Sequence, residues 1–261
     1  MKCEVFLMNS IEVIKYLESK YPKELAYDWD NVGLQVGSLN RKVKTILVTL
    51  DVTKEVVNEA IEKKVDLLIS HHPLIFKPLT SLSIESPRGW MINKMIKHDI
   101  TLYSMHTNYD LADGGMNDVL SKLLEIQNPQ LLDTIDGIGR FGEIEPMKMP
   151  EFIQKIKNTL NIDHVRFIGS LDKLVKIVGI SGGSGSNHVG QAKRQNCDVY
   201  LTGDVTYHTA LDCIQMGLNV IDVGHYAEKV FKDAVKLDLE AVFPEVTVIA
   251  SNVDSNPYIT L

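Results

Sequence analysis

The chain has 261 residues, of which 44% are hydrophobic, with a formal net charge of −7 and a pI of about 5.6. This length allows one large domain or two of ordinary size, with a substantial buried core. The acidic balance argues against a general nucleic-acid-binding surface, because phosphate contacts need clustered Lys and Arg and no basic run exceeds a couple of residues.

The cysteines and the apolar segments indicate where the protein works. Cys3, Cys197 and Cys213 are scattered and have no C-x-x-C spacing, which is typical of a reducing compartment and not of a disulfide framework. Charged residues interrupt the first twenty positions, and no stretch approaches the roughly 20 apolar residues that span a bilayer. We therefore expect a cytoplasmic protein without membrane contact.

The first part of the chain alternates short apolar runs with amphipathic segments, the pattern of an α/β fold. The first helix is expected to begin near Asn9, with Glu12 as its capping-box partner. Thr53 has the hydroxyl of an N-cap for a later helix. Further helices are expected around 89–97 and after Gly114–Gly115, and strands at 43–50, 65–70 and 100–104.

A second α/β set is expected after the polar stretch 127–139. Pro150 suits the first turn of one of its helices. Its strands are expected at 140–144, 164–168, 175–180, 199–202 and 219–223, and the run 246–250 is expected to return to the first set. The sequence thus predicts two interleaved α/β domains, one of residues 1–128 with 245–261 and the other of residues 129–244.

Histidines gather where predicted strands end. Those that follow a strand directly are His71, His72, His106 and His225. Acidic side chains share these positions, namely Asp51, Asp110, Asp204 and Glu228. Ligands of open α/β sheets bind outside the carboxyl ends of the strands, so this clustering marks the expected site of chemistry.

These residue types favour a metal site. Imidazole and carboxylate are the usual ligands of Zn, Mn and Fe, and a carboxylate can bridge two ions. His106 and Asp110 are spaced i, i+4, and His225 and Glu228 i, i+3, so each pair shares one face of a helical segment. With the two adjacent histidines there are six candidate ligands, more than one ion needs. Two ions are therefore predicted.

Other features have simpler interpretations. We expect ordinary capping or solvated roles for His98, His164 and His188. His208 lies a turn into a predicted helix and is kept as a possible lining residue. The Gly182–Gly185 loop could cradle a phosphate, but a tight strand–helix turn is favoured. Lys77 could meet an anionic substrate, although a solvated surface charge is favoured.

The motifs, in their order and spacing, resemble the Nif-three-like family, whose members are often called type-two homologues of GTP cyclohydrolase I. They are DNVGLQVG at 30–37, LDVT at 50–53, SHHPLIF at 70–76, HTNYD at 106–110, LTGD at 201–204 and GHYAEK at 224–229. The similarity runs from about Ile11 to the Asn-Pro-Tyr near the C-terminus. It implies two α/β domains with a dinuclear metal site in the cleft between them, and a toroidal homohexamer.

The resemblance also implies roles for individual residues. The ligands of the two divalent ions, Zn, Fe or Mn, would be His71, His72, Asp110, His225 and Glu228. His106 lines the site, either as a further ligand or as a catalytic group behind the ligands. Some relatives contain an inserted middle domain, which this chain is too short to hold.

Three functions fit these expectations. The leading hypothesis is a metal-dependent hydrolase that acts on a nucleotide or a related small molecule, with GTP ring opening suggested by the family label only. A phosphoesterase would use the same metals, and no residue decides between the two substrates. The alternative from another class is a non-enzymatic toroidal protein that binds metal or supports an interaction partner, since no independent nucleophile motif is present.

Overall fold

The computed structural model describes residues 8–259, which form two compact units. The first unit consists of the chain up to Ala112 and the chain from Phe231 on, and the second is Asp113–Val230. Cys3 lies outside the described residues. Cys197 and Cys213 are buried free thiols, as expected. Within 8–259, no helix is both long and apolar enough to cross a membrane.

The first unit contains a five-stranded sheet in the order β1-β4-β3-β2-β11, in which only β1 runs antiparallel to its neighbour. Its strands are β1 (Gly33–Val36), β2 (Thr45–Thr49), β3 (Leu67–Ser70), β4 (Thr101–Ser104) and β11 (Thr247–Ala250). Its helices are α1 (Ser10–Lys20), η1 (Lys23–Leu25), α2 (Lys54–Glu62), α3 (Pro87–Lys97), α4 (Thr107–Leu111) and α9 (Val230–Val242), the last of which begins at the unit boundary.

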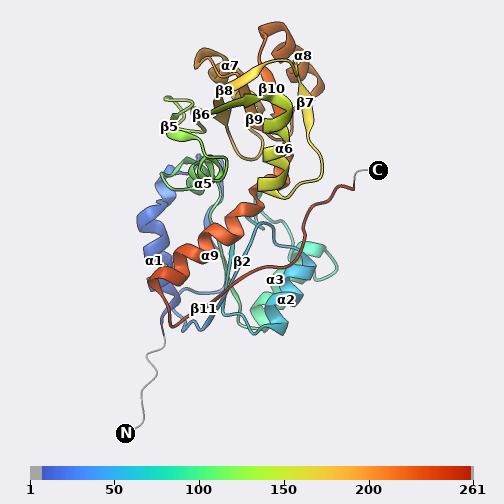
Figure 1. The fold of residues 1–261 in the computed structure, drawn as a ribbon. Coiled ribbons are helices and arrows are strands. Elements are labelled where there is room, and N and C mark those ends of the chain that lie inside the picture. Colours follow the sequence, from blue (N-terminus) through green and yellow to red (C-terminus); the bar gives the residue numbers. More distant parts are fainter. Residues whose placement is uncertain (1–7, 260–261) are drawn as a thin grey trace. The chain divides into compact units, whose positions relative to one another are not determined.

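Helices cover both faces of this sheet, which is why its strands are apolar at nearly every position. On one face, Leu47, Leu68 and Leu102 of the strands pack with Val56 of α2 and Met95 of α3. Figure 1 shows α1 and α9 beyond the other face. The two N-cap predictions are confirmed, because the side chains of Asn9 and Thr53 accept hydrogen bonds from the first turns of α1 and α2.

The second unit contains a six-stranded mixed sheet in the order β5-β6-β8-β9-β10-β7, with β8, β9 and β10 parallel to one another. Its strands are β5 (Gln127–Leu131), β6 (Arg140–Lys148), β7 (Arg166–Ile168), β8 (Leu174–Ile180), β9 (Val199–Thr202) and β10 (Asn219–Asp222). Its helices are α5 (Met116–Leu123), α6 (Met149–Leu160), η2 (Ser186–His188), α7 (Val189–Arg194), α8 (Tyr207–Met216) and η3 (His225–Lys229).

A separate core holds the second unit together. Tyr200 of β9 and Val220 of β10 are fully buried with Ala192 of α7 and Cys213 of α8. The helix predicted from Pro150 is α6, and it buries Phe152 and other apolar side chains along one face. The α/β prediction, with two sheets and a final strand that returns to the first, is confirmed by β11 pairing with β2.

The boundaries of the units differ from the expected positions after residues 128 and 244. The second unit already includes α5, because Asp118 of that helix binds Arg140 of β6. The first unit already includes nearly all of α9, because Asp238 binds Tyr16 and Lys20 of α1. These polar contacts join segments that are distant along the chain, so the local hydrophobic pattern of the sequence could not predict them.

Two strands were not expected. β1 is a short antiparallel edge strand, and β5 is an edge strand whose five residues are all exposed. β5 reads QNPQL, with Pro129 at its centre, so it lacks the alternation that marks a half-buried strand. Its pairing with β6 holds it in place instead.

Candidate metal centre

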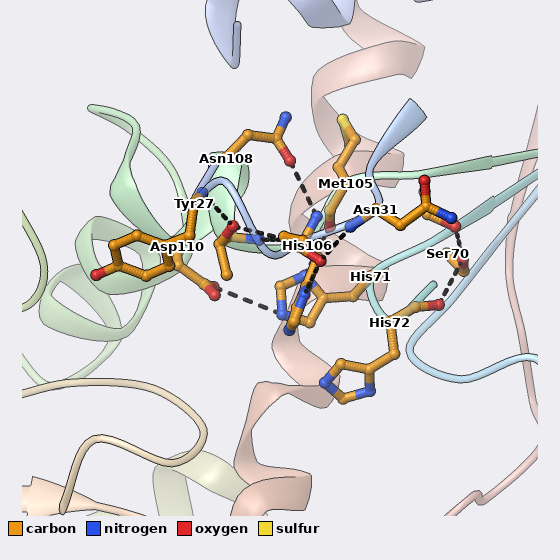
Figure 2. A network of polar contacts seen from close by, with 12 residues as sticks. Tyr27, Asn31, Ser70, His71, His72, Met105, His106, Asn108 and Asp110 are labelled. Carbon is orange, nitrogen blue, oxygen red and sulfur yellow. Dashed lines mark hydrogen bonds and ion pairs between the residues drawn. The ribbon is translucent and has the colours of Figure 1, made fainter. Parts of the chain in front are cut away.

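The parallel strands of the first unit bring the predicted histidines to one edge of the sheet. β3 lies between β2 and β4, with Ser70 in register with Ser104. These serines are buried, and their hydroxyl oxygens are 2.8 Å apart. His71, His72 and His106 come directly after these strand ends, so their rings meet, as Figure 2 shows.

The three imidazoles form a compact group. One nitrogen from each of His71, His72 and His106 lies within 4.8 Å of the other two, close enough to hold one metal ion. His71 is fully buried, whereas His72 and His106 are partly exposed. His71 is therefore fixed by its surroundings, whereas His72 and His106 can be reached by a small molecule.

Each of these histidines is held through Nδ1 by an oxygen acceptor. The acceptors are the Met105 carbonyl for His71 (2.8 Å), Asp51 for His72 (2.7 Å) and Asp30 for His106 (2.9 Å). An Nδ1 hydrogen bond to such an acceptor leaves the Nε2 lone pair for a metal, and this arrangement behind metal-ligating histidines is widespread. The tautomers thus fit ligands that bind through Nε2.

Asp110 completes the group in the first unit. Its carboxylate lies on α4, with Oδ1 3.5 Å from Nε2 of His71 and a side chain that is largely buried (Figure 2). Because Nδ1 of His71 donates to the Met105 carbonyl, Nε2 is the ring nitrogen that faces the Asp110 carboxylate. A cation between the two atoms would satisfy both, so the donor set fits a divalent metal.

The second unit presents a similar pair. His225 and Glu228 lie on η3, with His225 Nε2 3.3 Å from Glu228 Oε2. Nδ1 of His225 lies 2.7 Å from Asp204, which follows β9. Glu228 is buried, whereas His225 is exposed. An imidazole held through Nδ1 by an oxygen, with a carboxylate near its Nε2, therefore occurs at the carboxyl edge of the parallel strands in each sheet.

Comparison with known proteins settles the family. The model of the Duf34/NIF3 (NGG1p interacting factor 3) family matches residues 8–257, which is nearly the whole chain. The protein belongs to the Duf34/NIF3 family.

Relatives and solved structures agree with this assignment. A Streptococcus pneumoniae protein named "GTP cyclohydrolase 1 type 2 homolog" is 36% identical, and the match covers 96% of this chain and 99% of that protein. A Bacillus subtilis protein of the same name is 31% identical over 366 aligned positions, with 96% and 98% covered. The crystal structure of a Bacillus cereus protein related to NIF3 superposes with a TM-score of 0.93 at 30% identity, with 98% and 99% covered.

The glycine loop of this Duf34/NIF3 chain is a tight turn packed on a ligand candidate. Gly183 has φ +58°, and a Cβ there would come within 2.6 Å of a Glu228 carboxylate oxygen. The N–H groups of Gly182 and Gly185 already donate to Asn117 and Thr202. A carboxylate against the loop opposes an anion, so the structure favours the turn over the phosphate cradle.

The remaining histidines lie elsewhere. His98 ends α3, and His208 is exposed at the start of α8, beside the ring of Tyr207. His188 lies near Asp133 and Asp136, and these three form a further group of possible ligands. Asp133 accepts from the Ile135 amide and the Gln191 side chain, so its carboxylate closes a turn.

Asp30 is the main site residue that its sequence position did not reveal. Its side chain is fully buried and accepts hydrogen bonds from His106 and from the amide and hydroxyl of Thr107. Burial alone would raise the Asp30 pKa, but the hydrogen bond and charge of His106, together with the Thr107 bonds, lower it to about 2. Asp30 therefore stays ionised and fixes the His106 ring.

We expect Asp30→Asn to destabilise the chelator-treated, metal-free protein by about 2 kcal/mol above about pH 4. The folded pKa of about 2 lies below the ordinary value of 3.8, so the ionised carboxylate stabilises the fold above pH 3.8. That contribution is lost as the pH falls through about 2. Urea unfolding of both proteins between pH 2 and 7 measures it, and a difference that does not shrink below about pH 4 contradicts the assignment.

Proposed function

We propose that this protein is a metal-dependent hydrolase that acts on a nucleotide or a related small molecule. Two divalent ions, Zn, Fe or Mn, would be held by His71, His72, Asp110, His225 and Glu228. The observation that carries the proposal is the Nδ1 hydrogen bond that each histidine makes with an oxygen, which leaves Nε2 to face a metal. Histidines with only structural roles would not all need to form their hydrogen bonds through the same ring nitrogen.

The proposed ligands come from both units. The first unit offers the imidazoles of His71 and His72 and the carboxylate of Asp110, and the second offers the imidazole of His225 and the carboxylate of Glu228. Neither set alone supplies four ligands to each of two ions, the number that zinc usually takes. Asp110 would act as a bridging carboxylate, and water would fill the coordination positions that these residues leave open.

The chemistry divides between the ions and the protein. Two divalent ions, when bound, lower the pKa of water and stabilise negative charge that develops on an oxygen. His106 is held by Asp30 through Nδ1 and is partly exposed, so it can accept or deliver a proton at Nε2.

The relatives' name supports a nucleotide substrate, since it refers to a GTP cyclohydrolase. Ring opening of a purine and cleavage of a phosphoester remain the two reactions to compare. On the same resemblance we propose that the protein works in the cytoplasm as a toroidal homohexamer. Sedimentation equilibrium at micromolar concentration should then give six times the chain mass of 29.3 kDa, and a monomer would reject the assembly.

The reaction is tested by incubating metal-loaded protein with GTP, other nucleotides and phosphodiesters. We expect turnover that stops on chelation, and a roughly 100-fold or greater loss of kcat in His106→Ala with its metal content unchanged. His98→Ala, at the end of α3, is the matched control and should keep full activity. If the loaded protein hydrolyses none of these substrates, the non-enzymatic metal-binding alternative is favoured.

A further inference from the structure

Three aromatic side chains, two of them exposed and one half-buried, lie together beside the histidines of the first unit. Tyr27 and Trp29 are stacked, with ring centroids 5.5 Å apart and planes at 24°, and Phe76 lies edge-on to Trp29 at 5.8 Å. Trp29 is 59% exposed and Phe76 is 39% exposed. We call Tyr27, Trp29 and Phe76 the aromatic platform. Its exposure stands out, because large aromatic rings usually gain stability from burial.

The aromatic platform is fixed by hydrogen bonds on both sides of Trp29. The amide of Tyr27 donates to the Thr107 hydroxyl, and Asp30 accepts from the Thr107 amide and hydroxyl. The Asn31 side chain donates to the carbonyl of Ile75, which joins the Trp29 segment to the Phe76 segment. The rings are therefore held in place before any ligand arrives, which lowers the entropic cost of binding.

The aromatic platform continues directly into the imidazole group. The rings of Trp29 and Phe76 each lie 6.2 Å from the ring of His106. His106 in turn lies 5.2 Å from His71 and 5.4 Å from His72, between centroids. A small molecule with its reacting atom at these histidines could therefore reach the exposed rings of Trp29 and Phe76.

We propose that the aromatic platform stacks the planar ring of a purine-containing substrate. The inference deepens the proposed function and rests on it. Exposed aromatic faces bind the π-faces of nucleobases, and loss of one such ring weakens binding by roughly tenfold or more. Lys77, exposed directly after Phe76, supplies a positive charge on the same segment for a phosphate. A purely anionic sugar phosphate has no π-face and would not gain this stacking contribution.

Intrinsic fluorescence tests the proposal, because the chain contains only two tryptophans. Trp90 lies partly buried on α3, with Lys54 and Lys94 over its ring, and serves as the matched control. Trp90→Phe leaves Trp29 as the sole tryptophan, and Trp29→Phe leaves Trp90. Each variant is titrated with guanosine monophosphate and with ribose 5-phosphate, in zinc and in chelator, after circular dichroism has confirmed folding.

We expect saturable quenching by guanosine monophosphate in Trp90→Phe and none in Trp29→Phe. Ribose 5-phosphate should leave both signals unchanged. By calorimetry, Trp29→Ala should bind the nucleotide roughly tenfold more weakly or worse, whereas Trp29→Phe should keep most of the affinity. Chelation can weaken binding, but it should leave stacking on Trp29 detectable.

Three results would overturn the stacking proposal. They are absence of saturable quenching of Trp29, equal quenching by ribose 5-phosphate, and a Trp29 emission that shifts with protein concentration but not with nucleotide. The last would show that a second copy of the chain covers the aromatic platform. Failure of the proposed function looks different: Trp29 would still be quenched while the metal-loaded protein hydrolysed nothing.

Discussion

Asp110→Ala should lose both metal ions, whereas His225→Ala should retain up to about one ion per chain, as expected when one carboxylate bridges a two-metal site. Removing a bridging carboxylate takes a ligand from both ions and leaves their mutual repulsion unrelieved. An imidazole that serves one ion affects mainly that ion. Asp110 adjoins the buried His71, whereas His225 is exposed on η3, which agrees with these roles.

Elemental analysis after dialysis measures this difference. His98→Ala, at the end of α3, is the control and should bind as much metal as the wild type. Circular dichroism of each variant separates loss of a ligand from loss of the fold. Equal and complete retention of metal in both Asp110→Ala and His225→Ala would show that neither residue is a ligand, and the dinuclear proposal would fail.

Asp118→Ala should destabilise the second unit by about 3 kcal/mol, because it leaves a buried guanidinium without its main partner. The Arg140 side chain is only 4% exposed. Its Nε and one terminal nitrogen donate to the two carboxylate oxygens of Asp118, at 2.7 and 3.0 Å. The exposed Asp113 carboxylate, at 3.2 Å, compensates only in part.

Urea unfolding followed by circular dichroism gives the change in the free energy of unfolding. Asp113→Ala is the matched control, since its exposed ion pair should contribute no more than about 1 kcal/mol. Replacing both partners, as in Arg140→Met with Asp118→Leu, should recover part of the loss because no buried charge remains. A loss below about 1 kcal/mol in Asp118→Ala would mean that water reaches the guanidinium.

The sequence predicted that histidines and carboxylates lie at the carboxyl ends of the parallel strands, because the ends of those strands can be recognised in the sequence. Strands such as β2, β3 and β9 are covered on both faces, so each reads as a continuous apolar run with a clear end. A histidine directly after such a run is placed at the carboxyl edge by the strand itself. The end of the apolar run is therefore enough to place His71 at that edge.

Other parts of the site depend on neighbours that no local pattern reveals. Asp30 bonds to His106 across 76 positions of sequence, from a loop with no periodicity. Trp29 and Phe76 meet because Asn31 ties their two segments together. β1 and β5 are edge strands held by pairing partners instead of by apolar faces. The spacing of residues within one segment does not predict contacts of this kind.

The return of β11 to the first sheet also bears on how the protein is made. β11 pairs with β2, yet Thr247 is synthesised about 200 residues after Thr49, a delay of roughly 10–40 s at ordinary translation speeds. All of Asp113–Val230 leaves the ribosome during that interval. The inserted unit can therefore fold before β2 has paired with β11. A nascent chain stalled before β11 would expose the unpaired edge of β2 to chaperones or to other chains.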